Sequence, residues 1–188
     1  YVHSLVHRNF RVLPSWLEEG MAQFYGFTRF EGDRMYIGAP PRNTGWLRAL
    51  FSRTSPPIPE FIVTRSMYFP KNEEESRVYY AQAWALTHFL MFGPGMDLGV
   101  KLKHFVNLLQ RGVEQKKAFE DSFGPFNEVQ KQYDLYLQKV AFTAGVVPAP
   151  SNLSEKDFTA RLMSLDETHL ALTDLSQTAT AVGFHQKK

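Results

Sequence analysis

The chain has 188 residues, with 21 Lys and Arg against 19 Asp and Glu. Its net charge of +2 argues against a dedicated nucleic-acid binder, which would show a basic patch or stripe. Its 44% hydrophobic and 21% charged residues exclude disorder of the whole chain and are typical of a globular domain. It has no Cys, which excludes disulfides, thiolate catalysis and Cys-ligated zinc, and no apolar run reaches the roughly 18 residues of a membrane span.

The N-terminal part of the chain predicts two helices and a β-hairpin. Apolar residues recur at helical spacing over residues 1–8, and Pro14 suits the first turn of a second helix over residues 15–25. In that second helix the apolar positions follow i, i+3, i+4 and i+7, which predicts a buried face. Residues 27–37 hold two short aromatic runs around a Glu-Gly-Asp turn signal, which predicts the hairpin.

The middle of the chain is predicted to be helical apart from one proline-rich connection. A short helix at residues 44–52 precedes Pro56, Pro57 and Pro59, which predict an extended loop. Glycines then divide the following sequence into four helices, over residues 73–92, 96–111, 113–123 and 126–144. We therefore expect a mainly α fold with one β-hairpin, arranged as a helical bundle.

A change in composition divides the chain near residue 146. The run Val-Val-Pro-Ala-Pro-Ser is typical of a linker, which we place at residues 146–152. Residues 1–145 then form one domain, and residues 153–188 form a helical tail that could begin a further helical segment. Within this tail, Ser154–Asp157 resembles a helix N-cap signature.

Two N-terminal segments carry side chains that can bind a metal. His3 and His7 are four residues apart and so share a helix face, while Glu18 and Glu19 follow on the second helix. Glu19 lies opposite the apolar face, and two His with one carboxylate form an established catalytic zinc site. On these residues alone, solvated surface side chains are the more ordinary explanation. A non-catalytic His3–His7 site is a further alternative, because Ser4 stands where a general base would be.

The segment Trp16-Leu-Glu-Glu-Gly-Met-Ala22 resembles the second half of the gluzincin metallopeptidase signature. In that signature a His-Glu-x-x-His helix is followed by a helix with the pattern Trp-Leu-x-Glu-Gly-x-Ala. The resemblance implies that Glu19 is the third zinc ligand and His3 the second histidine ligand. Leu13-Pro-Ser15 is also similar to the peptidase-MA-like bacterial proteins, a gluzincin group.

The segment Tyr80-Ala-Gln-Ala-Trp-Ala-Leu86 resembles the Tyr-x-x-Ala element of aminopeptidase-type gluzincins. There the tyrosine donates to the oxyanion of the tetrahedral intermediate. The resemblance implies this catalytic role for Tyr80, with Tyr79 as the second candidate. Weaker similarities further along extend the resemblance over residues 1–142.

The first His and the Glu of the signature would stand two positions and one position before Tyr1. We therefore expect the sequence to begin inside the motif, so that it lacks one ligand and the general base and is not competent as it stands. For the intact protein, the resemblance implies hydrolysis of peptide or protein substrates with Zn²⁺ as cofactor. It also implies the bacterial periplasm or exterior as location, and nothing in the sequence predicts an oligomeric state.

Other polar and aromatic residues have structural explanations. We expect Trp16 to pack in the core, Gln23 to hydrogen-bond to a metal ligand, and Glu73–Glu75 to form a solvated helix start. Four further histidines show no partner pattern and are expected at the surface or satisfied within the core: His88, His104, His169 and His185.

A second hypothesis is a catalytically inactive zincin-like scaffold that acts as a binding module. Under the enzyme hypothesis, the hairpin over residues 27–37 is the candidate edge for binding an extended peptide by strand addition. The residues encoded before Tyr1 separate the two hypotheses, because His-Glu supports the enzyme and any other pair favours the scaffold.

Overall fold

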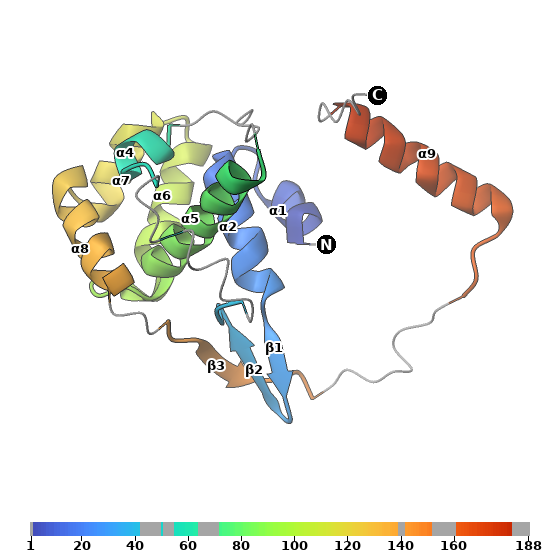
Figure 1. Cartoon of the computed structure of the whole chain (residues 1–188), viewed down its shortest axis with the longest axis horizontal. Helices are drawn as coiled ribbons and strands as arrows, with labels where there is room; N and C mark the ends of the chain where they lie inside the picture. Colours follow the sequence, from blue (N-terminus) through green and yellow to red (C-terminus); the bar gives the residue numbers. More distant parts are fainter. Residues whose placement is uncertain are drawn as a thin grey trace. The chain divides into compact units, whose positions relative to one another are not determined.

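The computed structural model of the chain is mostly helical with one small sheet (Figure 1). It describes residues 2–41, 50, 55–63, 72–138, 142–151 and 161–181. The predicted fold class, mainly α with a β-hairpin, is confirmed. The elements in chain order are α1 (Val2–Asn9), α2 (Ser15–Gly26), β1 (Arg29–Glu31), β2 (Arg34–Ile37), α4 (Ile58–Phe61), α5 (Glu73–Phe92), the 3₁₀ helix η1 (Asp97–Gly99), α6 (Val100–Gln110), α7 (Gln115–Phe123), α8 (Phe126–Gln138), β3 (Gly145–Pro148) and α9 (Leu165–Ala181).

The chain divides into two compact units, Tyr1–Ala149 and Pro150–Lys188. In the second unit, α9 begins with a reciprocal cap in which the Ser164 hydroxyl accepts from the Glu167 amide and the Glu167 carboxylate accepts from the Ser164 amide. The N-cap signature expected at residues 154–157 lies outside the described residues. None of the described helices combines the length and the hydropathy that crossing a bilayer requires.

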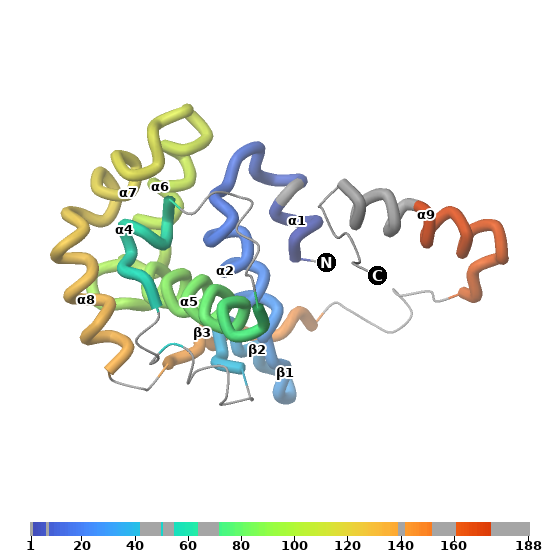
Figure 2. Tube along the Cα trace, turned by 45° about the horizontal axis from the view of Figure 1, so that its top comes forward, coloured from blue at the N-terminus to red at the C-terminus, as the bar shows by residue number. Residues whose placement is uncertain are grey.

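Helix α5 is the centre of the first unit. The Asn72 side chain caps it by accepting from the Glu75 amide at 2.9 Å, and three glutamates occupy its positive end. Residues 81–90 are all buried, because α2, α6 and α8 pack around this stretch (Figure 2). A helix that is enclosed on every side forms the core instead of covering it.

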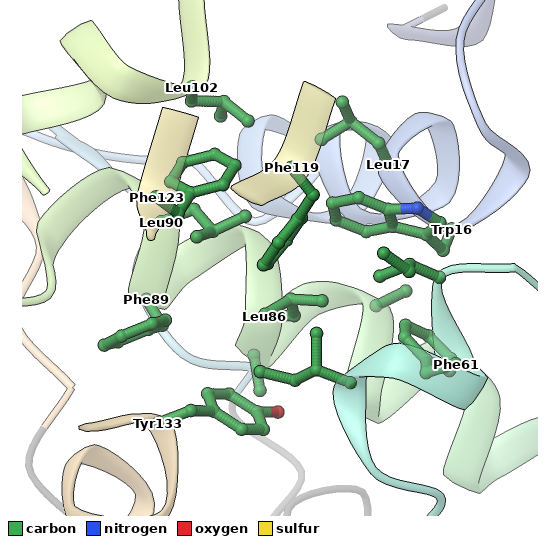
Figure 3. Packing of buried hydrophobic residues seen from close by; sticks show 14 of the residues in the cluster. Trp16, Leu17, Phe61, Leu86, Phe89, Leu90, Leu102, Phe119, Phe123 and Tyr133 are labelled. Atoms are coloured by element: carbon green, nitrogen blue, oxygen red, sulfur yellow. The ribbon is translucent and has the colours of Figure 1, made fainter. Parts of the chain in front are cut away.

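Aromatic rings from several elements fill the space around α5 (Figure 3). Trp16 of α2 is fully buried, with ring centroids 6.4 Å from Phe61 of α4 and 6.2 Å from Phe105 of α6. The predicted packing role of Trp16 therefore matches its position. Because this ring packs against both α4 and α6, it anchors the start of α2 to the core.

Gly20 lets α2 approach α5 closely. A Cβ at this position would overlap the Thr87 hydroxyl and would stand 2.5 Å from the Ala83 carbonyl oxygen. Thr87 and Ala83 lie one turn apart on α5, so the backbone of α2 crosses directly over that turn. Only a glycine fits at this crossing. Packing alone therefore explains why Gly20 follows Glu19.

We expect Gly20→Ala to lower the free energy of unfolding by about 1–3 kcal/mol, because a backbone carbonyl cannot move aside as a flexible side chain can. Urea unfolding followed by circular dichroism measures the change. Gly26→Ala is the matched control on the same helix, since a Cβ there would meet nothing within 4 Å. Equal stability of the two variants would contradict the close crossing.

The sheet has three antiparallel strands in the order β1-β2-β3. Met35 of β2 pairs with Phe30 of β1 on one side and with Val147 of β3 on the other. The prediction of a linker beginning at residue 146 was therefore wrong for residues 146–148. Two adjacent β-branched valines favour an extended strand, and the hairpin leaves the far edge of β2 free to pair with it.

Two other predictions also need correction. The prolines do not keep residues 55–61 extended, because Pro57 caps α4 and Pro59 lies in its first turn, where its missing N–H is not needed. The helix predicted over residues 96–111 is interrupted at its start, since Leu98 and Gly99 of η1 have φ of +49° and +84°, and the α-helix α6 begins only at Val100. Helix α8, which was predicted to reach residue 144, ends at Gln138 in the described residues. The helix predicted at residues 44–52 lies outside the described residues apart from Leu50.

His88 is a satisfied core histidine, one of the two alternatives expected for it. Its Nδ1 lies 2.5 Å from the Tyr136 hydroxyl, and its Nε2 lies 2.9 Å from the Thr143 carbonyl oxygen. A carbonyl only accepts, so Nε2 carries the proton and Nδ1 accepts from Tyr136. Burial lowers the pKa of His88 to about 4, although the backbone hydrogen bonds to Thr143 and Gly38 partly oppose this.

Between about pH 6.5 and pH 4 the unfolded chain protonates at His88 while the folded chain does not. We therefore expect stability to fall by up to about 3 kcal/mol as the pH drops through this window. Urea unfolding of His88→Gln at several pH values should show a flatter dependence. His104→Gln changes an exposed histidine of α6 and should keep the wild-type slope. A wild-type slope in the His88 variant would refute the assignment.

Candidate metal-binding site

The structure brings His3 together with both N-terminal glutamates. Helices α1 and α2 pack against each other across the short connection between them. His3 Nδ1 lies 3.3 Å from Glu18 Oε1, and His3 Nε2 lies 3.7 Å from Glu19 Oε2. The three side chains are partly shielded, with the imidazole 45% exposed and the two carboxylates 21% and 28% exposed.

The two nitrogens of the His3 ring face different carboxylates. The 3.7 Å separation on the Glu19 side exceeds a direct hydrogen bond of about 2.7–3.2 Å. Two tetrahedral zinc ligands, each about 2.0–2.2 Å from the ion, lie roughly 3.4 Å apart, close to the observed spacing. The Nε2 side of His3 therefore suits a shared cation, and the Nδ1 side suits a hydrogen bond to Glu18.

Two donors are fewer than a protein zinc centre uses. Within the described part of the chain, no three His, Cys, Asp or Glu side chains are arranged to hold one metal ion. Glu18 does not complete such a set, because it faces the opposite nitrogen of the His3 ring. His3 and Glu19 thus fit two positions of a zinc site that needs a third protein ligand.

Burial raises the pKa of Glu19, and the neighbouring charge of Glu18 raises it further, while His3 acts in the opposite direction. A carboxylate held in this way is costly when ionised, and a bound cation would relieve that cost. The site therefore stores electrostatic free energy that ligand binding can recover.

Both tyrosines of α5 lie within reach of the Glu19 charge. Burial raises the pKa of Tyr79 to about 12; the Ser15 hydroxyl lowers it, and Glu19 adds to the increase. Burial also raises the pKa of Tyr80, again with a contribution from Glu19. Tyr79 is only 8% exposed and packs on Phe61, whereas Tyr80 is 37% exposed. Tyr80 is therefore the phenol that an external molecule can reach beside Glu19.

The other candidates divide into three groups. Gln23 Oε1 is buried and has no hydrogen-bond partner in the described part of the chain, so this oxygen does not accept a hydrogen bond from His3. His104 and His169 are exposed, and Glu73–Glu75 lie in the first turn of α5, as expected for a solvated helix start. The side chain of His7 and the whole of His185 lie outside the described residues, so the His3–His7 alternative stays a prediction.

Residues 3–111 match the family described as a protein of unknown function, DUF1570. The chain belongs to the DUF1570 family. The matched segment runs from His3 through Glu19, Tyr79 and Tyr80 to the end of α6, so every side chain of the candidate site lies inside it. The comparisons with curated proteins and with solved structures give no match.

We expect Glu19→Gln to raise the melting temperature of the metal-free protein at pH 7. Because the pKa of Glu19 is raised, ionisation above pH 4.5 destabilises the fold, and glutamine removes that charge. Differential scanning calorimetry measures the change. Glu128→Gln alters an exposed glutamate of α8 and should shift stability by less than about 0.5 kcal/mol. A lower melting temperature for Glu19→Gln would contradict the strain assigned to this carboxylate.

Proposed function

We propose that this chain carries part of the active site of a zinc-dependent peptide-bond hydrolase of the gluzincin type. The observation that supports the proposal is the approach of His3 Nε2 to Glu19 Oε2 at 3.7 Å from two successive helices. The resemblance of Trp16–Ala22 to the gluzincin signature assigns ligand roles to these same two residues. A His and a Glu encoded directly before Tyr1 would complete the site.

His3 and Glu19 would hold the metal. When bound, zinc lowers the pKa of a coordinated water and polarises a substrate carbonyl. Glu18 positions the ring: with Nδ1–H donated to Glu18 Oε1, the lone pair of Nε2 faces Glu19. The signature does not imply this role for Glu18, because any residue can stand at the position between Leu and the ligand Glu.

Tyr80 supplies a proton donor at the edge of the site. Because burial and Glu19 raise its pKa above 10, its hydroxyl stays protonated at neutral pH. Its exposure lets it donate a hydrogen bond to an oxyanion that develops beside Glu19. Tyr79 is more buried and packs on Tyr80 with ring centroids 5.6 Å apart, which limits the directions that the Tyr80 ring can take.

Strand β1 is the proposed place for an extended substrate. It follows α2 directly and forms one edge of the described sheet, so its outer side can accept a further strand. Phe30 on this strand is 65% exposed and offers an apolar contact to a substrate side chain.

Metal binding by the protein extended by the residues encoded before Tyr1 tests the ligand roles. Titration with Co²⁺, followed by its visible absorption, should show binding that His3→Ala and Glu19→Gln abolish. We expect Glu18→Gln to weaken binding by about 10–100-fold, the usual effect of losing a partner that orients a ligand. His104→Ala is the control, as an exposed histidine on α6. Unchanged binding in His3→Ala or Glu19→Gln would refute the site.

Catalysis is tested on the protein extended by the residues encoded before Tyr1. With His-Glu in that position, Tyr80→Phe should lower kcat for peptide hydrolysis by about 10²–10³, with little change in KM. Tyr25→Phe, which alters an exposed phenol at the end of α2, should leave kcat unchanged. Retained zinc without hydrolysis would indicate the inactive scaffold instead.

A further inference from the structure

The exposed side of helix α6 is basic. With 3.6 residues per turn, six exposed residues fall within about one third of the circumference of this helix. The opposite side is buried in the core, so the orientation of the exposed side is fixed. We define the α6 face by these six residues, which are Val100, Lys103, His104, Asn107, Gln110 and Arg111.

The loop between α1 and α2 extends this face. Gln110 Oε1 accepts a hydrogen bond from the Arg11 amide at 3.1 Å, and Gln110 Nε2 donates to the Val12 carbonyl oxygen at 2.6 Å. These two bonds hold the loop beside the C-terminal end of α6. Arg11 and Val12 are both exposed, so the loop adds a cation and an aliphatic side chain at this end of the face.

The cations of this surface are not neutralised. Residues 1–17 and 98–113, which include the loop and the α6 face, contain no Asp or Glu. Lys103, Arg111 and Arg11 take part in none of the ion pairs among the described residues. Such a concentration of like charge attracts an anionic partner and repels a cationic one.

Exposed aliphatic side chains flank these cations. Val100 lies on the α6 face and is 65% exposed, and Leu98, just before the helix, is 80% exposed. At the other end, Val12 is 61% exposed. Transfer of such side chains out of water is favourable. Cations together with exposed aliphatic residues are typical of protein surfaces that lie at the boundary between lipid headgroups and acyl chains.

This combination fits a lipid surface better than a nucleic acid. Binding through the phosphate backbone commonly uses about 6–10 cation contacts, more than this surface offers. Proteins that bind single strands also stack bases on aromatic rings, and the α6 face carries no Phe, Tyr or Trp. The aliphatic side chains would gain little from a sugar-phosphate backbone, whereas the interfacial region of a bilayer accommodates them.

We propose that the α6 face and the adjoining loop bind the surface of an anionic phospholipid bilayer. Lys103, Arg111 and Arg11 contact the lipid phosphates, while the flanking aliphatic side chains enter the region between headgroups and acyl chains. This surface includes none of the residues of the candidate metal site, so the inference stands independently of the proposed hydrolase.

Flotation of the 188-residue chain with lipid vesicles tests the proposal. Vesicles of phosphatidylcholine with about 30% phosphatidylglycerol should retain the chain at low ionic strength, and vesicles of phosphatidylcholine alone should not. Salt at about 1 M, where the Debye length is about 3 Å, should release most of it. Equal retention by the two kinds of vesicle, or no retention by the anionic ones, would overturn the proposal.

Substitutions on the α6 face identify the surface that binds. Lys103→Ala and Arg111→Ala should each lower the affinity for anionic vesicles about fivefold, the usual effect of one cation near such a surface. Lys131→Ala, which removes an exposed cation of α8, is the matched control and should keep the wild-type affinity. All of these side chains are exposed, so circular dichroism should show an unchanged fold. Wild-type affinity in both α6 variants would refute the assignment.

Leu98→Asn separates a lipid surface from other polyanions. Asparagine tolerates the left-handed backbone at this position, where φ is +49°, so the substitution removes the apolar side chain without new strain. Affinity for anionic vesicles should fall about threefold to tenfold, while retention on immobilised heparin stays unchanged. Unchanged vesicle affinity in this variant would overturn the lipid proposal and would indicate a surface for acidic macromolecules instead.

Discussion

The close crossing of α2 over α5 at Gly20 determines which side chains surround the candidate metal site. Without a Cβ, the backbone of α2 comes within contact distance of the Ala83 carbonyl and the Thr87 hydroxyl. Glu19 precedes that glycine, and Tyr79 and Tyr80 lie one turn before Ala83 on α5. The crossing thus brings the Glu19 carboxylate within electrostatic reach of both phenols. A larger residue at position 20 would move the two helices apart and separate these groups.

The candidate metal site is unfavourable for folding by itself. Glu18 and Glu19 are adjacent carboxylates, and burial disfavours the charged form of Glu19. His3 offsets part of this repulsion by facing both of them. Such clusters of strained charge are common at functional sites, since a ligand of opposite charge recovers the free energy that folding spent there. The surrounding core, with Trp16 at the start of α2, supplies the stability that offsets this unfavourable cluster of charges.

Helix α5 presents different groups along its surface. Tyr80 lies near the candidate metal site, Gln82 lines a pocket with residues of α8, and His88 near the other end joins α8 to the segment before β3. All three depend on one buried helix whose ends are fixed by the Asn72 cap and by Gly93. A change in the position of α5 would therefore act on the candidate metal site, on this pocket and on the sheet.

Periodicity and capping signals in the sequence were sufficient to predict α1, α2 and α5, since 3.6-residue patterns, prolines and glycines are local properties. The motif around Glu19 likewise indicated which acid to examine. Three features could be found only in the tertiary structure: the third strand, the proline-capped helix α4 and the hydrogen bonds of His88. Pairing of Val147 with Met35 and contact of His88 with Thr143 join residues far apart in the chain, and no local pattern encodes such pairs. For the same reason only the folded chain shows that His3 turns one nitrogen to each glutamate, and that Gln82, Tyr133 and Asp134 meet around one pocket.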